Sequence, residues 1–322
     1  MTEGYFFGGL TPMVTERDAW LVLIYSLGLF FGVLIWVACL TVFLSATGTD
    51  IWSAFGMDKF LMLNALLTMV ALLTPVLAQG LLRGWAWRQA LRWRPLSFWV
   101  VFQVTLATLA LNLSVSQGFL WLLSMPFFEW AQQSGYGELL EKIAHHKEMP
   151  LLVIIAVMVQ ALPEELTFRG VIQQGFERRY APTIAITLTS LFFALFHLNP
   201  LQALIVLPTS LFWGWVAFRT QSIIPTVVAH ACQNGLTALA LAMPSLAGQG
   251  SGSPLAQSPN WFAAVAGLLL WVGLTWHLAQ HLPTHKEGGA HGERERVTAT
   301  PHQTGVADGS DGGGSLEPDE RR

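Results

Sequence analysis

The chain has few charged residues for its length. Only 11% of its 322 residues are Asp, Glu, Lys or Arg, against about 25% in an average soluble domain. Hydrophobic residues make up 53%, and the mean hydropathy is +0.49. A surface so poor in charge can face lipid, and the net charge of −3 offers no basic surface to a nucleic acid. The sequence therefore predicts an integral membrane protein that contacts the lipid bilayer and binds no nucleic acid.

Cysteine is also scarce, and acidic residues outnumber basic ones at the N-terminus. Cys39 and Cys232 each lie in an apolar segment, which excludes a disulfide framework and a thiolate zinc motif. Glu3, Glu16 and Asp18 precede a long apolar run, whereas a secretory signal would carry positive charge ahead of a short one. We therefore expect no cleaved signal peptide.

Long hydrophobic runs are abundant. Spanning a bilayer takes about 20 mostly apolar residues in a helix, and lipid-exposed strands or loops would leave backbone groups unpaired. The expected fold class is thus all-α: a polytopic transmembrane helical bundle of about eight helices. A tight turn at residues 197–200 can join the short fifth run to the sixth. The runs are 19–46, 60–82, 96–123, 150–173, 183–196, 201–218, 222–242 and 261–281.

Composition divides the chain into four expected regions. Residues 1–149 hold three transmembrane helices and an outer loop, and 150–242 form a helical core that carries unusual polar residues. Residues 243–282 supply an outer loop and the last helix. Residues 283–322 are rich in Gly, Thr, Asp, Glu and Arg. Such a segment cannot bury enough apolar surface to fold, so we expect a disordered cytoplasmic tail.

Basic residues predict the orientation of the bundle. They follow the second, fourth and sixth apolar runs, which puts them all on one side of the membrane. Loops rich in Lys and Arg face the cytoplasm, so we expect a plasma-membrane protein with both termini cytoplasmic. These residues are Arg83, Arg88, Arg92, Arg94, Arg169, Arg178, Arg179 and Arg219.

Two adjacent carboxylates interrupt the fourth apolar run. A charge at membrane depth costs several kcal/mol, about 2.5–3.5 on insertion scales, so such residues usually mark function. Glu165 and Arg169 are four residues apart and share a helix face, which predicts an ion pair. Glu164 points about 100° away and is free to face a cavity as a general base. Pro163 removes a helix hydrogen bond and predicts a bend or a widened turn that could admit water. The alternative is a charge cluster that merely ends the helix at the interface.

Two later runs add histidines and an amide. His197 could position water for Glu164, although a histidine after an aromatic stretch is also typical of a helix end. His230 and Asn234 are four residues apart on one face. Both can donate to an oxyanion, or they can hold neighbouring helices together. Three further amides are interpreted as contacts between helices: Asn64, Gln103 and Asn112.

Taken in order, these residues resemble the three motifs of the CPBP intramembrane proteases. This family, also called Abi, includes CAAX prenyl endoproteases and bacteriocin-processing or immunity-associated proteins. The resemblance covers residues 151–242 and implies an all-helical membrane peptidase. The motifs are Glu164-Glu165-x-x-x-Arg169, Phe193-x-x-x-His197 and His230-x-x-x-Asn234.

The resemblance also implies roles for these residues. Glu164 would be the general base that activates water, with His197 assisting. Arg169, together with Glu165, would support the site, as would Phe193 from the second motif. His230 and Asn234 would stabilise the oxyanion.

Metal dependence is a separate question. Two Glu and two His could bind zinc, with Glu164, His197 and His230 as ligands. The chain has no His-Glu-x-x-His helix, and Asn234 is a poor zinc ligand. We therefore favour glutamate-type chemistry without a cofactor.

The function predicted on these grounds is an intramembrane endopeptidase that cleaves a membrane-associated peptide or protein with Glu-activated water. One alternative is a non-catalytic scaffold or immunity protein that binds a peptide partner through the same cavity. An ion or proton transporter is a third. It is disfavoured because the polar groups are bunched in three motifs rather than spread along a path.

Overall fold

The computed structural model describes residues 13–49, 51–125, 151–242 and 258–282. Throughout this part of the chain the regular elements are helices, which confirms the all-α class. The predicted tail and most of both outer loops lie outside the described residues. The helices are α1 (Glu16–Ala46), α2 (Ile51–Phe55), α3 (Met57–Arg83), α4 (Trp87–Ala90), α5 (Phe98–Leu123), α8 (Leu151–Glu165), the π-helix η2 (Leu166–Ile172), α9 (Gln173–Glu177), α10 (Pro182–Leu195), α11 (Pro200–Thr220), α12 (Ile224–Ala242) and α13 (Trp261–His281).

Long helices coincide with the predicted runs. α8, η2 and α9 follow one another without a break, so the described residues form about eight long helical segments, as predicted. Five helices are long and apolar enough to cross a membrane by length and composition: α1, α5, α11, α13 and residues Met62–Arg83 of α3. These spans establish a multi-pass integral membrane protein.

Several helix starts are encoded locally. Thr15 caps α1 in a reciprocal capping box with Asp18, and such caps satisfy backbone N–H groups that have no intrahelical partner. Asn199 caps α11, with Pro200 at the first helical position. α10 ends at Leu195, so the fifth and sixth runs are separate helices joined by the predicted tight turn.

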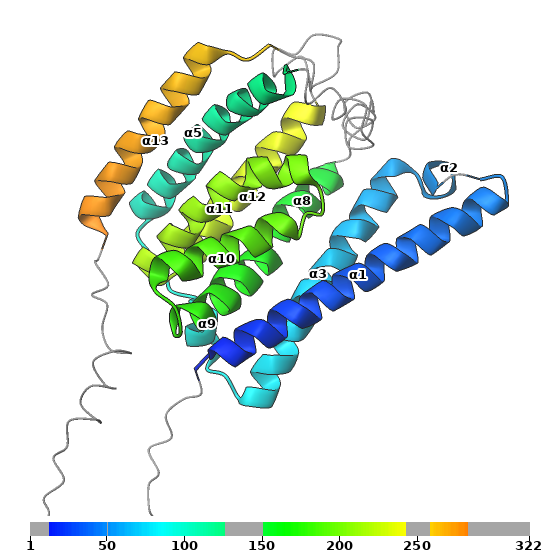
Figure 1. Ribbon diagram of the computed structural model, residues 1–322, viewed down its shortest axis with the longest axis horizontal. Helices are drawn as coiled ribbons and strands as arrows, with labels where there is room; N and C mark the ends of the chain where they lie inside the picture. Colours follow the sequence, from blue (N-terminus) through cyan, green and yellow to red (C-terminus); the bar gives the residue numbers. More distant parts are fainter. Residues whose placement is uncertain (1–12, 50, 126–150, 243–257, 283–322) are drawn as a thin grey trace, which may run out of the picture. The chain divides into compact units, whose positions relative to one another are not determined.

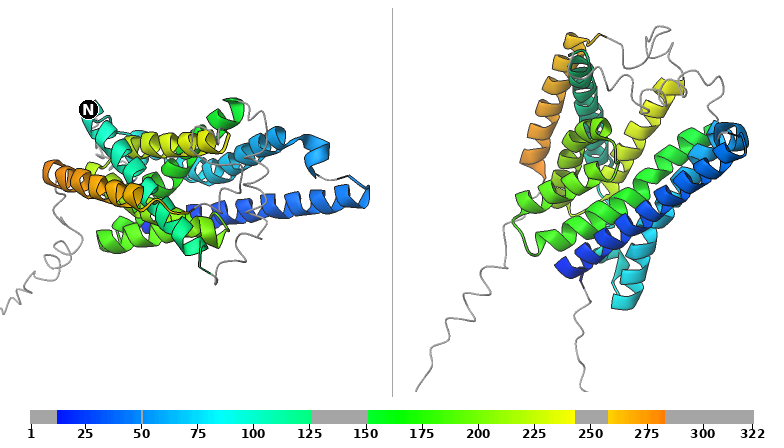
Figure 2. Two further views of the ribbon diagram at one scale, coloured as in Figure 1. Left: turned by 90° about the horizontal axis from the view of Figure 1, so that it is seen from above. Right: turned by 45° about the vertical axis from the view of Figure 1, so that its right-hand side comes forward.

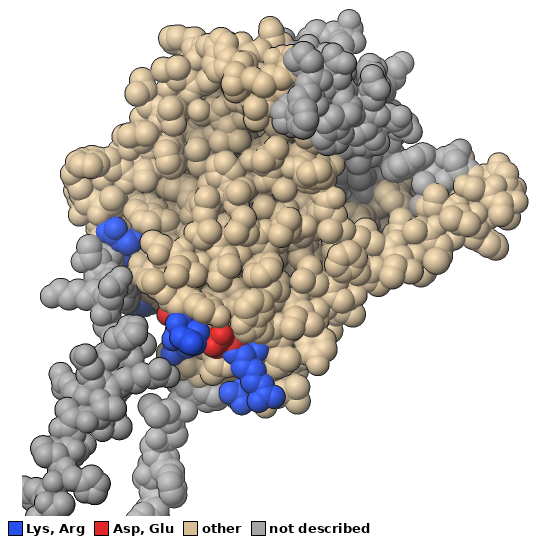
Figure 3. Space-filling model, in the orientation of Figure 1, with Lys and Arg blue, Asp and Glu red and all other residues tan. Residues whose placement is uncertain are grey.

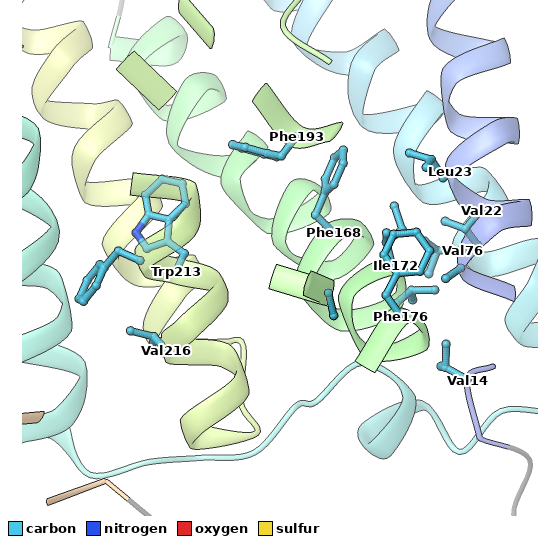
Figure 4. Close-up of a cluster of buried hydrophobic side chains, with 14 of the residues drawn as sticks. Val14, Val22, Leu23, Val76, Phe168, Ile172, Phe176, Phe193, Trp213 and Val216 are labelled. Carbon is cyan, nitrogen blue, oxygen red and sulfur yellow. The ribbon is translucent and has the colours of Figure 1, made fainter. Parts of the chain in front are cut away.

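Four helices pack side by side in the order α3, α8, α12, α5, and α13 packs on the outside of α5 (Figures 1 and 2). We call the first four the central row. α1 packs on α3, η2 and α9, while α10 packs on α11 and α11 on α5. Figure 4 shows the buried apolar cluster that ties α1 and α3 to the η2–α9 segment, with Ile172 and Phe176 facing Val22 and Val76. Packing of this face fixes the segment that carries the carboxylate pair.

Charged groups gather at one end of the visible face (Figure 3). Several of the predicted basic residues are held near one another by partners from other helices. Arg169 is an exception, because its side chain is fully buried against Glu165 inside the bundle. Which side of the membrane this end faces stays a prediction. The contacts are Arg83 Nε to Asp18 Oδ1 at 3.4 Å, Arg179 Nε to Glu16 Oε2 at 3.7 Å, the Arg92–Glu177 pair, and Arg219 Nη2 donating to the carbonyls of Ala279 (2.8 Å) and Leu282 (2.7 Å).

The close contact between α5 and α13 allows a prediction about the free energy of unfolding. Gly267 of α13 lies so close to α5 that an added Cβ would be 2.6 Å from the Ala110 carbonyl oxygen. We expect Gly267→Ala to lower the free energy of unfolding by about 1–3 kcal/mol, because overpacking forces the two backbones apart. Gly273→Ala is the matched control on the same helix, since its Cβ would meet nothing within 4 Å. Thermal unfolding in detergent measures both, and equal stability of the two variants would contradict the prediction.

Candidate active site

A π-helical turn carries the first motif. α8 ends at Glu165, and η2 continues the same segment through Arg169. At its end, the backbone N–H of Gln173 donates to the carbonyl of Phe168, five residues back. Pro163 lies inside α8, and the widened backbone begins after it, at Leu166. Because the missing N–H of Pro163 affects the preceding turn, η2 is not the widened turn predicted at Pro163. Single π turns occur frequently at functional sites.

Glu165 and Arg169 form the predicted ion pair. Arg169 Nη1 donates to Glu165 Oε1 at 2.9 Å, and both side chains are 0% exposed. Arg169 Nη2 donates to Ser210 Oγ at 2.7 Å. The same Glu165 oxygen accepts from His230 Nδ1 at 3.1 Å. Glu165 is thus sealed inside the protein and bonded to fixed groups, which suits a structural role.

Aromatic rings surround the Arg169 guanidinium. Its central carbon lies 4.3 Å from the centroid of the Phe193 ring and 5.4 Å from that of Trp213. Both distances lie within the range in which the face of a ring attracts a cation. Phe193 therefore supports the site by packing against the charged group that holds Glu165.

His230 lies between the two carboxylates. Because a carboxylate only accepts, the 3.1 Å contact with Glu165 places a proton on Nδ1. The other ring nitrogen, Nε2, is 3.6 Å from Glu164 Oε2, an ion-pair distance that is long for a direct hydrogen bond. Trp213 stacks on the imidazole at a centroid distance of 4.3 Å, and its Nε1 donates to Thr108 Oγ1 at 3.1 Å. Stacking and hydrogen bonding together fix the orientation of the ring.

His197 is oriented by its own helix end. Its Nδ1 donates to the backbone carbonyl of Phe193 at 2.9 Å, so a neutral ring keeps Nε2 as a proton acceptor. The ring of Phe193 packs edge-on against the imidazole, with centroids 5.2 Å apart. His197 is therefore both at a helix end and in the site, and the two interpretations made from the sequence are compatible.

Asn234 makes the contact between helices that was one of the two interpretations from the sequence, and its oxyanion role stays a prediction. Its Nδ2 donates to the Val157 carbonyl of α8 at 3.2 Å, which is a contact between helices. An amide nitrogen carries two protons, so one bond of this kind leaves the second proton for another acceptor. The side chain also lines a cavity.

That cavity has a volume of about 620 Å³ and brings the motifs together. Glu164, His197, His230 and Asn234 all line it, from α8, the α10–α11 turn and α12. Glu164 is 12% exposed, whereas its neighbour Glu165 is 0% exposed. The predicted division of the pair is confirmed: Glu164 faces the cavity and Glu165 faces Arg169.

Sequence reasoning missed several groups. Ser210 and Trp213 are three residues apart on α11 and reach Arg169 and His230. This i, i+3 spacing of polar-tipped side chains in an apolar helix was the available signal. The interpretation of Asn64 and Asn112 as contacts between helices also overlooked the cavity, which both of them line.

The carboxylate and histidine side chains of the site are also potential metal ligands. One oxygen of Glu165 is occupied by Arg169 and His230, and His230 Nδ1 is occupied by Glu165. Glu164, His197 and His230 line the same cavity. Over the described ranges, however, no three His, Cys, Asp or Glu side chains are placed to hold a metal ion. The Nδ1 contacts of His197 and His230 leave both Nε2 atoms facing other groups, so metal dependence stays a prediction.

Fold and site together define a class: a multi-pass helical membrane protein with a carboxylate, histidine and amide cluster around a cavity. Residues 146–236 match the family model described as Type II CAAX prenyl endopeptidase Rce1-like. This match confirms the resemblance drawn from the three motifs, all of which lie within it, whereas α1, α3, α5 and α13 lie outside it. Searches of curated proteins and of solved structures return no match.

Proposed function

We propose that the protein is an intramembrane endopeptidase that uses Glu164 to activate water. The observation that carries the proposal is the unequal environment of the two carboxylates. Glu165 is fully buried against Arg169, while Glu164 lines a cavity with two histidines and an amide. A general base must reach its proton donor directly or through one water, and Glu164 is the carboxylate of the pair that meets this condition.

The charges of the cluster support this assignment. The opposite charges of Glu165 and Arg169 balance each other. The remaining ionisable pair is Glu164 and His230, which lie at ion-pair distance. With Nδ1 bonded to Glu165, His230 can donate from Nε2 only when the ring carries both protons. The proposed oxyanion role therefore requires the doubly protonated ring.

The reaction then proceeds in two steps. Glu164 takes a proton from water while the water oxygen bonds to the peptide carbonyl carbon, and His197 Nε2 orients the water by accepting its second proton in a hydrogen bond. The oxyanion receives hydrogen bonds from His230 Nε2 and the free amide proton of Asn234. The carbon–nitrogen bond then breaks, and Glu164 returns its proton to the leaving amine.

We propose a membrane-associated peptide or protein as the substrate, with the basic end of the bundle facing the cytoplasm. The basic end of the bundle supports this orientation through the positive-inside rule, with both termini cytoplasmic. The description of the matched family names a CAAX prenyl endopeptidase. A prenylated substrate is therefore one member of the proposed class.

Metal removal is expected to leave the activity unchanged. The proposed mechanism assigns Glu164 as the base and His230 as a hydrogen-bond donor, so it requires no metal ion. We expect purified active protein to contain no stoichiometric zinc by elemental analysis and to keep its kcat/KM after dialysis against a chelator. Loss of turnover on chelation, restored by added zinc and not by magnesium, would contradict the glutamate-type assignment.

The function itself is tested by comparing protein termini in membranes. Cells expressing the protein and cells expressing Glu164→Gln are compared for new N-termini of membrane proteins. We expect a set of termini that depends on Glu164 and reappears when purified protein is added to the variant membranes. No such set, together with a cellular phenotype that Glu164→Gln retains, would favour the non-catalytic scaffold.

A further inference from the structure

Histidine is unevenly distributed along the chain. Five of the nine histidines lie in the last 46 residues, beyond every residue that the proposed mechanism uses: His277, His281, His285, His291 and His302. The first two belong to the end of α13, and neither is among the residues that line the active-site cavity. Short tracts rich in histidine are typical of metal binding. We therefore looked for ligand geometry at the end of α13.

The imidazoles of His277 and His281 lie next to each other on α13. Residues four apart share a helix face, and the two ring centroids are 4.1 Å apart, with 30° between the ring planes. Two nitrogens bound to one zinc-sized ion, each at about 2.0–2.1 Å, lie at most about 4.2 Å from each other. Both side chains are exposed, so small side-chain rotations can direct one nitrogen of each ring to the same ion. The spacing of the rings therefore suits a shared ion.

A hydrogen bond within the helix prepares His281 for this role. Its Nδ1 lies 2.8 Å from the backbone carbonyl oxygen of His277. Because a carbonyl only accepts, Nδ1 carries the proton, and a neutral ring keeps its lone pair on Nε2. Metal-bound histidines almost always donate their other ring N–H to a carbonyl, carboxylate or water, which fixes the tautomer. His281 has this arrangement before any ion binds.

The pair also lies where a cation from water is favoured. α13 ends at His281, and the carbonyl end of a helix carries a partial negative charge that attracts cations. This end closes a candidate membrane span on the outside of α5, so it is at the edge of the bundle (Figure 1). Arg219 of α11 donates to the carbonyls of Ala279 and Leu282. The turn that carries His281 is therefore anchored to the rest of the bundle.

We propose that His277 and His281 form a binding site for a divalent transition-metal ion. The ion belongs to the class that prefers imidazole, which includes Ni²⁺, Cu²⁺ and Zn²⁺. Water completes the coordination, because the described residues supply two ligands. Resident zinc sites have three or four protein ligands, so this site binds reversibly and loses its ion on dialysis. A bound ion links residues one turn apart and holds the last turn of α13 against fraying. The inference is independent of the proposed function.

Nickel binding to the full-length protein tests the site. Untagged protein in nanodiscs is titrated with Ni²⁺ by calorimetry, and with Mg²⁺ for comparison. We expect a saturable Ni²⁺ site that Mg²⁺ does not occupy, because Mg²⁺ prefers oxygen ligands. His277→Gln combined with His281→Gln should weaken Ni²⁺ binding by at least about tenfold, the loss that even an outer partner of a metal ligand produces when it is changed. Both residues are exposed, so the fold should persist, and thermal unfolding without metal checks this.

A variant of the tail that removes the same number of imidazoles is the matched control. His285→Gln combined with His291→Gln keeps the pair on α13 and should leave the Ni²⁺ affinity nearly unchanged. Undiminished binding in the α13 double variant would overturn the proposal, and so would an equal loss in both double variants. Binding of nickel by His197 and His230 in the cavity would give the first of these two results.

Discussion

Replacing Glu164 with glutamine is expected to lower kcat by about 10²–10⁴-fold, the usual contribution of a general base. Glutamine has nearly the same shape but cannot take a proton from water, so the loss should appear in kcat more than in KM. The fold should persist, because Glu164 lines the cavity and the ion pair beneath it involves Glu165. Turnover of a cleaved peptide and thermal unfolding, measured on the same reconstituted preparation, separate the two effects.

Glu16, a carboxylate outside the cavity, provides the control for the Glu164→Gln variant. Glu16 lies at the start of α1 and accepts hydrogen bonds from Trp20 and Tyr180, away from the cavity residues. Glu16→Gln makes the same chemical change and should leave kcat within a factor of about two, because surface-type contacts contribute little. Turnover retained by Glu164→Gln would exclude it as the base.

Arg169→Met is expected to have the largest effect on stability. It leaves the Glu165 carboxylate fully buried without its counter-ion, and breaking a buried pair in this way costs about 3–5 kcal/mol of unfolding free energy. Ser210 loses its hydrogen-bond partner in the same change. We expect a much lower unfolding temperature in detergent, and loss of folded protein at the temperature of expression.

A double variant separates charge from packing. Glu165→Gln with Arg169→Met removes both charges and keeps an oxygen to accept from His230 Nδ1. Replacing both members of a buried pair is often close to neutral, so at least half of the lost stability should return. A double variant no more stable than Arg169→Met would show that the pairing of charge is not the cause.

Much of the site followed from spacing along single helices. Glu165 and Arg169 meet because residues four apart share a helix face, and Glu164 diverges because adjacent residues do not. These are local facts, and the structure confirms them. The π-helix η2 did not follow from the sequence, because it begins after Pro163, whereas a proline removes a hydrogen bond to the turn before it.

Contacts between helices were beyond the reach of a single sequence. The hydrogen bond from His230 to Glu165 spans 65 positions and that from Trp213 to Thr108 spans 105. Neither has a periodic signal, since each depends on the order in which helices pack. For the same reason Asn64 and Asn112 could only be interpreted as isolated amides in the sequence. They line the same cavity because α3 and α5 pack beside α8 and α12.

The sequence by itself determined a helical membrane protein with about eight long segments, the residues of its three motifs and the division of the Glu pair. These depend on hydropathy and helical periodicity, which act over a few turns of one chain segment. Tertiary structure alone decided that His230 lies between two carboxylates, that Trp213 and Ser210 contact His230 and Arg169, and that Asn64 and Asn112 line the same cavity. These features depend on side chains meeting across helix interfaces, where the packing of the whole bundle selects the neighbours.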